Sequence, residues 1–110
     1  MLTAYLPFSL VLPLIQESLD SARYYLQRFE KEQRLVCLVE CEHVLHQAYG
    51  ALRMVESYGP ALLLEECEAL LAMMLNAERV DKAAIDAIQS ALVRLPLYLE
   101  LLENGTEDRP

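Results

Sequence analysis

The stretch that decides the fold is Leu45–Leu71, LHQAYGALRMVESYGPALLLEECEALL. Apolar residues recur at spacings of three and four on both sides of Gly59-Pro60, which is the pattern of two amphipathic helices joined by a tight connection. Proline is favoured in the first turn of a helix, where its missing N–H leaves no helical hydrogen bond unmade. Gly59-Pro60 is therefore expected to end one helix and begin the next.

The same spacing continues in both directions from this stretch and gives four apolar stripes. Their members are Leu12, Ile15, Leu19, Ala22, Leu26 and Phe29; Cys37, Cys41, Val44, Ala48, Ala51 or Leu52, and Val55; Leu63, Cys67, Leu70, Met74 and Ala77; and Ile85, Ile88, Leu92, Leu95, Leu99 and Leu102.

Polar segments separate the stripes. Residues 30–34 form a charged corner, Asp81 is a candidate N-cap, and Asn104-Gly105 is expected to close the last helix. Short connections force neighbouring helices to run antiparallel. The sequence therefore predicts an all-α, antiparallel up-down four-helix bundle with buried cysteines and helices near residues 11–30, 34–58, 61–77 and 81–103.

Composition narrows the class of protein. The 110 residues have the length of one domain, and the absence of tryptophan together with two phenylalanines and three glycines argues against an all-β domain. Nine basic and seventeen acidic residues give a net charge of −8, which opposes binding to phosphate backbones. No nucleic-acid partner is expected. The three cysteines cannot all pair internally, which is compatible with a reducing compartment.

The apolar N-terminal run does not have the pattern of a targeting segment. The first basic residue is Arg23, and Pro7 and Pro13 interrupt a run that is too short to span a membrane. We predict a cytoplasmic chain without membrane insertion.

Pro96 lies inside the fourth stripe, which keeps its register from Leu95 to Leu99. A continuous, kinked helix is therefore expected. Apolar side chains outside the stripes leave surface that either contacts another domain or subunit or is covered by the N-terminal segment. These side chains belong to Leu6, Phe8, Leu14, Leu97 and Leu101.

His46 is the candidate functional residue. At about 100° per residue, Gly50 lies about 40° and Arg53 about 20° around the helix from it, opposite the core positions. The same solvent-facing strip contains Val39, Glu42, His43 and Tyr49. A glycine inside a helix weakens it by about 1 kcal/mol relative to alanine, so Gly50 is expected to have a packing or functional reason.

This geometry suits a phosphoacceptor. A partner carrying an aspartyl phosphate must approach the imidazole closely, and a glycine one turn away removes the Cβ that would obstruct it. One ring nitrogen attacks while the other donates its proton to an acceptor, for which the candidates are Glu42 or, from the third helix, Glu65, Glu66 or Glu68. The partner supplies the metal, so no cofactor is expected in this chain. An ordinary surface histidine is the alternative.

His46-x-x-x-Gly50 on the second helix of such a bundle resembles the histidine phosphotransfer (HPt) domain, whose motif is His-x-x-Lys-Gly. More specifically, residues 35–75 resemble the N-terminal region of chemosensory proteins of type IV pilus systems, the group of ChpA/PilL-type hybrid chemotaxis kinases and FimL-like proteins. The resemblance continues more weakly into LVRLPLYLELLENG, residues 92–105.

The resemblance implies a part in a two-component relay that controls twitching motility. His46 would be the phosphoacceptor and Gly50 the clearance residue. Tyr49 stands where an HPt domain has lysine; Arg53 could replace that charge, whereas Glu42 and Glu56 oppose a phosphate.

The resemblance also implies that residues 1–110 are a single HPt-like domain excised from the N-terminus of a larger protein. Its partners would be response-regulator receiver or kinase domains, other domains of the same protein, and a second copy in a homodimer. FimL-like members work without phosphotransfer, so a degenerate scaffold for protein–protein interaction is the alternative function.

Other chemistries fit less well. Cys37 and Cys41 lie on the core side while His43 and His46 lie opposite, so one metal ion cannot collect all four. No Ser-His-Asp set, glycine-rich phosphate loop or pair of catalytic carboxylates is present in the sequence. An autonomous enzyme is not expected.

Overall fold

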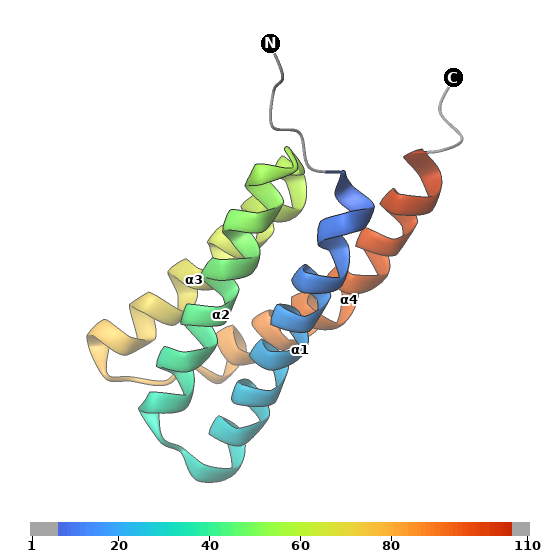
Figure 1. Ribbon diagram of the computed structural model, residues 1–110. Helices are drawn as coiled ribbons and strands as arrows, with labels where there is room; N and C mark the ends of the chain where they lie inside the picture. Colours follow the sequence, from blue (N-terminus) through green and yellow to red (C-terminus); the bar gives the residue numbers. More distant parts are fainter. Residues whose placement is uncertain (1–6, 107–110) are drawn as a thin grey trace.

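The computed structural model describes the backbone of residues 7–106 and the side chains of residues 7–104. This part of the chain is all-helical and contains no strand, as predicted. Its four helices, which reverse direction from one to the next (Figure 1), are α1 (Phe8–Glu32), α2 (Leu35–Met54), α3 (Tyr58–Ala77) and α4 (Lys82–Thr106).

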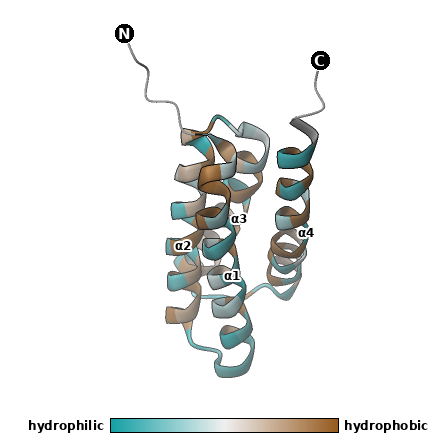
Figure 2. Ribbon diagram, turned by 45° about the vertical axis from the view of Figure 1, so that its right-hand side comes forward, coloured by the Kyte–Doolittle hydropathy of each residue, from teal (hydrophilic) through white to brown (hydrophobic). Residues whose placement is uncertain are grey.

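Each helix contacts its neighbours along the chain, and α4 also contacts α1. The packing of α4 is uneven, because it meets α1 more extensively than α3, and Figure 2 shows it beside the group formed by the other three helices. A hydrogen bond from Gln89 Nε2 to Glu30 Oε1, 3.3 Å long, joins α4 to the C-terminal end of α1. An up-down bundle is compatible with this arrangement.

The core draws apolar side chains from all four helices, and no polar or charged residue is buried among the described residues. Every predicted stripe residue of α1 is buried, as are those of α4 except for Leu102, which is partly buried. The three cysteines are free and buried, as predicted.

The stripes predicted for α2 and α3 are partly wrong. Leu38, Leu45, Leu64 and Leu71 are fully buried, although the predicted stripes omit them. Val44, Val55, Leu63 and Leu70 are only partly buried, and Ala77 is exposed. Apolar residues of α2 and α3 extend beyond one face, as the exposed Val36, Val39 and Leu62 show. More than one register therefore satisfies the spacing, and the packing against neighbouring helices selects one.

The helix ends also differ from expectation. Gly59 and Pro60 both lie inside α3, in its first turn, so they do not terminate α2. That role belongs to Glu56, which is left-handed with φ 59°, while Ser57 N–H donates to Leu52 O at 2.8 Å in a Schellman-type arrangement. At the far end, α4 continues through Asn104-Gly105 to Thr106.

Two expectations about α4 are confirmed. The Asp81 carboxylate caps its N-terminus, accepting from Ala83 N–H at 3.0 Å and Ala84 N–H at 3.4 Å. The helix is continuous through Pro96.

Glu78 ends α3 in the left-handed region, with φ 50°, and offers a test of these helix ends. The left-handed conformation costs a non-glycine residue about 1–2 kcal/mol, whereas glycine adds about 0.4–1 kcal/mol of entropy to the unfolded chain. Glu78→Gly is therefore expected to raise the free energy of unfolding by roughly 0.5 kcal/mol. Urea denaturation measures it.

The matched control is Glu66→Gly. Glu66 is exposed inside the same helix, where glycine should lower the free energy of unfolding by about 1 kcal/mol. Equal destabilisation by both substitutions would contradict the assignment of left-handed strain to Glu78.

The apolar surface expected outside the core is present. Leu14, Leu97 and Leu101 are between 62% and 68% exposed, whereas Phe8 packs partly against the core and Leu6 lies outside the described residues. Across the described residues, no helix combines the length and the apolar character that a membrane span requires.

Candidate functional site

His46 lies on the outer side of α2, where 70% of its side chain is exposed. Its Nδ1 lies 3.0 Å from Oε1 of Glu68 on α3. Sequence spacing placed the histidine on the solvent side and gave four candidate glutamate partners; packing of α2 against α3 brings Glu68 into contact.

The Glu68 carboxyl group fixes the orientation of the imidazole. Its side chain is 17% exposed, and this burial raises its pKa above the ordinary range, with Glu42 and Glu65 adding to the rise while the bond to His46 opposes it. An ionised carboxylate only accepts hydrogen bonds, so a neutral imidazole paired with ionised Glu68 carries its proton on Nδ1. In that tautomer the lone pair is on Nε2.

Tyr49 and Arg53 form the C-terminal side of the site. The Tyr49 ring stacks on the His46 ring, with 5.7 Å between centroids and 24° between planes. Arg53 Nη1 donates to the Tyr49 hydroxyl at 3.1 Å, and its guanidinium lies 5.8 Å from the centroid of that ring. The hydrogen bond raises the pKa of Arg53. Arg53 therefore shares the predicted face, but its guanidinium is held by Tyr49.

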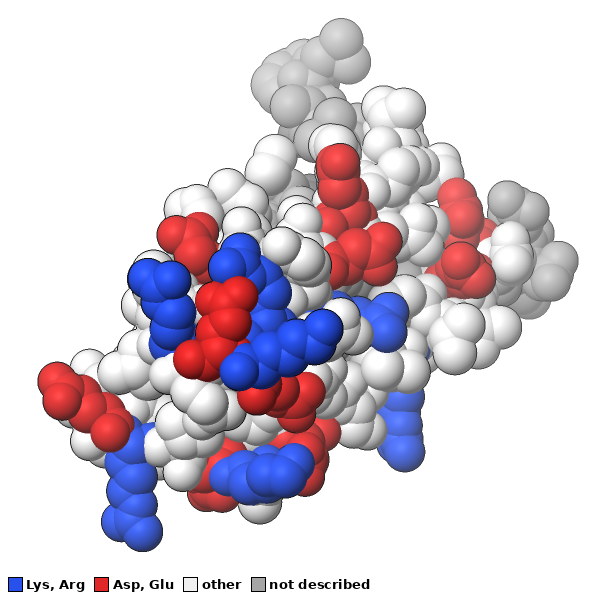
Figure 3. Space-filling view, turned by 90° about the horizontal axis from the view of Figure 1, so that it is seen from below, with Lys and Arg blue, Asp and Glu red and all other residues white. Residues whose placement is uncertain are grey.

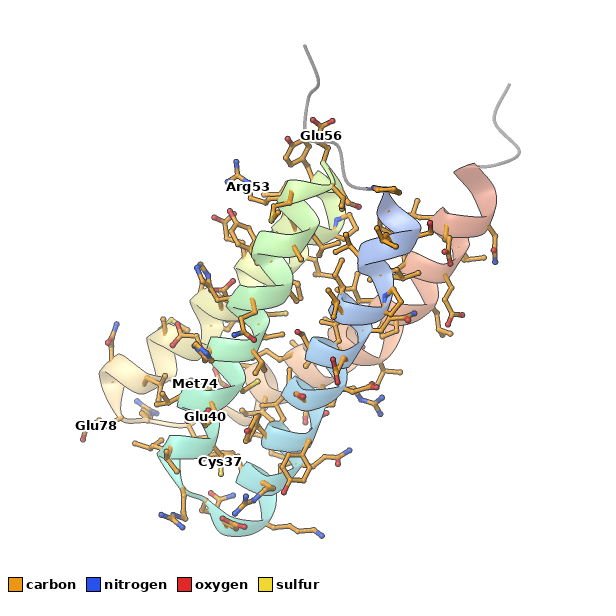
Figure 4. The ribbon with its side chains drawn as sticks, in the orientation of Figure 1. Cys37, Glu40, Arg53, Glu56, Met74 and Glu78 are labelled. Atoms are coloured by element: carbon orange, nitrogen blue, oxygen red, sulfur yellow. The ribbon has the colours of Figure 1, made fainter. Side chains whose placement is uncertain are left out.

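Glu56 lies beyond the end of α2, near Arg53 (Figure 4). Glu42 is closer to the histidine, because both line one shallow depression on the surface. Of the two carboxylates expected to oppose a phosphate, Glu42 is thus the one placed at the imidazole.

Neither the packing nor the backbone conformation of this chain requires a glycine at position 50. Apart from its chain neighbours and the local helix backbone, a Cβ at Gly50 would meet no atom within 4 Å, and no glycine among the described residues has a positive φ. A side chain is thus tolerated by the fold at this position, and the surface one turn beyond His46 is left open.

The depression beside His46 has a volume of about 460 Å³ and is lined by Val39, Glu42, His43, His46 and Glu68. His43 is exposed, and its Nε2 lies 3.4 Å from Nε2 of Gln47. The sequence placed His43 on this face without giving it a partner, because side-chain conformation decides whether an i, i+4 pair is in contact.

The cysteines take no part in this site. Cys41 Sγ donates to Ala22 O at 3.5 Å inside the core, and burial raises the pKa of Cys41 to about 12 and that of Cys67 to about 11. Within the described part of the chain, no three His, Cys, Asp or Glu side chains are grouped so that they could hold a metal ion.

Basic side chains gather away from His46, at the end of the bundle seen from below in Figure 3. This end carries Lys31 in the last turn of α1, Arg34 between α1 and α2, and Arg79 between α3 and α4. Acidic residues are interspersed among them, including Glu32, which pairs with Arg28 at 2.8 Å. This end is therefore a mixed charged surface.

No family model, curated protein or solved structure matches this chain.

Proposed function

We propose that this chain is an HPt-like signalling module of a two-component, chemotaxis-type system that controls type IV pilus motility, with His46 as its phosphoacceptor. The sequence resemblance of residues 35–75 supports the family and the cellular process. A cytoplasmic location and an HPt-like up-down topology belong to the same proposal.

The observation that carries the proposal is the arrangement of His46, Glu68 and Gly50. The imidazole is 70% exposed and its Nδ1 is 3.0 Å from the Glu68 carboxylate, so a neutral ring that donates from Nδ1 has its lone pair on the free Nε2. One turn further along α2, Gly50 leaves the surface open, although the fold has room for a side chain there. An oriented nucleophile with clearance beside it is what transfer from a partner's active site needs.

The transfer step follows from this geometry. The Nε2 lone pair attacks the phosphorus of a partner's aspartyl phosphate, an N–P bond forms, and the P–O bond to the aspartate breaks with its electrons on the leaving carboxylate. The proton stays on Nδ1, where the Glu68 carboxylate stabilises the positive charge that develops on the ring. The partner supplies the metal ion and the remaining charge stabilisation.

The direct test is incubation of the chain with phosphoramidate and, separately, with a phosphorylated receiver domain, followed by intact-mass analysis at neutral pH. A mass increase of one phosphoryl group, mapped to His46, supports the proposal. Absence of any increase with both donors overturns it.

A second candidate function is a scaffold that has kept the bundle and lost the chemistry. Tyr49 favours it, because its ring stacks on that of His46 and its hydroxyl accepts a hydrogen bond from the Arg53 guanidinium. The acidic side chains of Glu42 and Glu68 at the depression also oppose an incoming phosphate.

Tyr49→Lys separates the two candidates. Lysine brings a cation next to the phosphoryl group, and a hydrogen bond to a charged group contributes about 1.5–3 kcal/mol, so we expect transfer at least about tenfold faster than in the wild type. Tyr49→Phe is the matched control, because it keeps the ring without adding charge. A wild type and a Tyr49→Lys variant that both remain unphosphorylated would establish the scaffold.

The proposed partners follow from the two candidates. Phosphotransfer requires a receiver or kinase domain at His46. The exposed leucines Leu97 and Leu101 of α4 fit contact with another domain of the same protein or with a second copy of the chain. Light scattering across a concentration series tests the second copy: a molar mass that stays at one chain rejects it.

A further inference from the structure

His43 shares the surface depression with His46. The two residues are three apart on α2, a spacing that brings side chains to within about 5–6 Å at Cβ on the same side of a helix. A group attached to His46 inside the depression therefore has the His43 ring as a neighbour.

Two neighbours already contact the His46 ring, one at Nδ1 and one at a ring face. Nδ1 faces Glu68 on α3, and Tyr49, on the C-terminal side, stacks on one face of the ring. Among the described residues Nε2 of His46 has no hydrogen-bond partner. His43 lines the same depression from one turn toward the N-terminus.

A phosphoryl group on Nε2 carries negative charge and needs hydrogen-bond donors. The depression offers the carboxyl groups of Glu42 and Glu68, which are acceptors when ionised, and Val39, which is apolar. Arg53 does not line the depression, and its Nη1 donates to the Tyr49 hydroxyl. His43 is the lining side chain that has a ring N–H to donate.

The hydrogen bonding of His43 leaves that donor free. The Gln47 amide nitrogen is 3.4 Å from Nε2 of His43. In the tautomer in which His43 Nε2 accepts from this amide N–H, the ring proton is on Nδ1. Within the described residues, Nδ1 of His43 has no hydrogen-bond partner.

We infer that His43 is the phosphoryl-binding residue of this site, whose ring N–H donates to a phosphoryl oxygen carried by Nε2 of His46. The inference rests on the proposed function and adds a second residue to it. Glu42, His46 and Gln47 from α2 and Glu68 from α3 are the polar groups that surround the ring.

The test compares wild type, His43→Ala and His43→Lys in phosphoryl transfer from the phosphorylated receiver. Loss of one hydrogen bond to a charged group predicts transfer about tenfold slower for His43→Ala, whereas His43→Lys, which restores a donor, should recover the wild-type rate or exceed it. Val36→Ala is the control: Val36 is exposed on α2 outside the depression, and its replacement should leave the rate unchanged.

A second readout follows the ring itself. ¹H–¹⁵N correlation spectra of the two imidazoles should show the Nδ1 resonance of His43 shifting when His46 is phosphorylated by phosphoramidate. A phosphorylated wild type with an unmoved His43 signal and a His43→Ala rate equal to that of wild type would overturn the inference while leaving the proposed function intact. A wild type that accepts no phosphate from either donor would overturn both.

Discussion

Replacing His46 with glutamine is expected to abolish phosphate uptake completely. The glutamine amide nitrogen has no lone pair available for attack on phosphorus, while the side chain keeps a donor that can face Glu68. Since 70% of the His46 side chain is exposed, the fold should hardly respond, and surface substitutions change stability by at most about 0.5 kcal/mol. Intact mass after incubation with phosphoramidate measures the uptake, and thermal denaturation measures the stability.

The matched substitution for His46→Gln is His43→Gln, on the same face of α2. It should leave phosphorylation detectable, because His46 keeps its nucleophile. A His46→Gln variant that still gains a phosphoryl group would move the acceptor elsewhere and refute the assignment of His46.

Gly50→Ala is expected to stabilise the protein and impair its function. Alanine in a helix interior is favoured over glycine by about 1 kcal/mol. The new Cβ meets no atom within 4 Å apart from its chain neighbours and the local helix backbone, so the free energy of unfolding should rise by up to that amount. The same methyl group lies where a receiver must approach His46. Small misplacements of reacting groups reduce rates by up to about a hundredfold, and we expect transfer from the receiver to be slowed at least tenfold.

Two comparisons make the Gly50 prediction specific. Phosphorylation by phosphoramidate should be unaffected, because a small donor does not cover the position of the methyl group. Gly59→Ala adds a methyl group to α3 at a position that is equally open and should leave transfer from the receiver unchanged. Equal transfer by wild type and Gly50→Ala would show that the glycine does not serve the approach of a partner.

The sequence was most informative where apolar residues are confined to one helix face. The stripes of α1 and α4 are buried as predicted, from Ile15 and Leu19 to Leu92 and Leu99. In α2 and α3 the pattern predicted helices but not their rotation, because apolar residues are not confined to one face. Helix ends were the least predictable part, since Glu56 and Glu78 take the left-handed conformation that is usually a glycine's.

The candidate site was predictable in part for a similar reason. The exposure of His46 and its position relative to Gly50 depend on α2 alone. The spacing of residues along that helix is enough to predict both. The choice of Glu68 over Glu65 or Glu66 depends on how α3 is rotated and shifted against α2, which only packing determines. The capture of Arg53 by Tyr49 depends on side-chain conformation, and spacing does not show it.

Burial of the three thiols has a practical consequence for labelling. The pKa of about 12 for Cys41 means that fewer than about one of these side chains in ten thousand is a thiolate at neutral pH, and the thiolate is the form that reacts with maleimides. Cys67 has a pKa of about 11, so its thiolate is scarce at neutral pH as well. Cys37 is 4% exposed and is therefore shielded from the reagent. A cysteine introduced at an exposed helical position such as Ser90 would therefore accept a fluorophore selectively, so single-molecule or anisotropy measurements of partner binding can use the protein with its native cysteines in place.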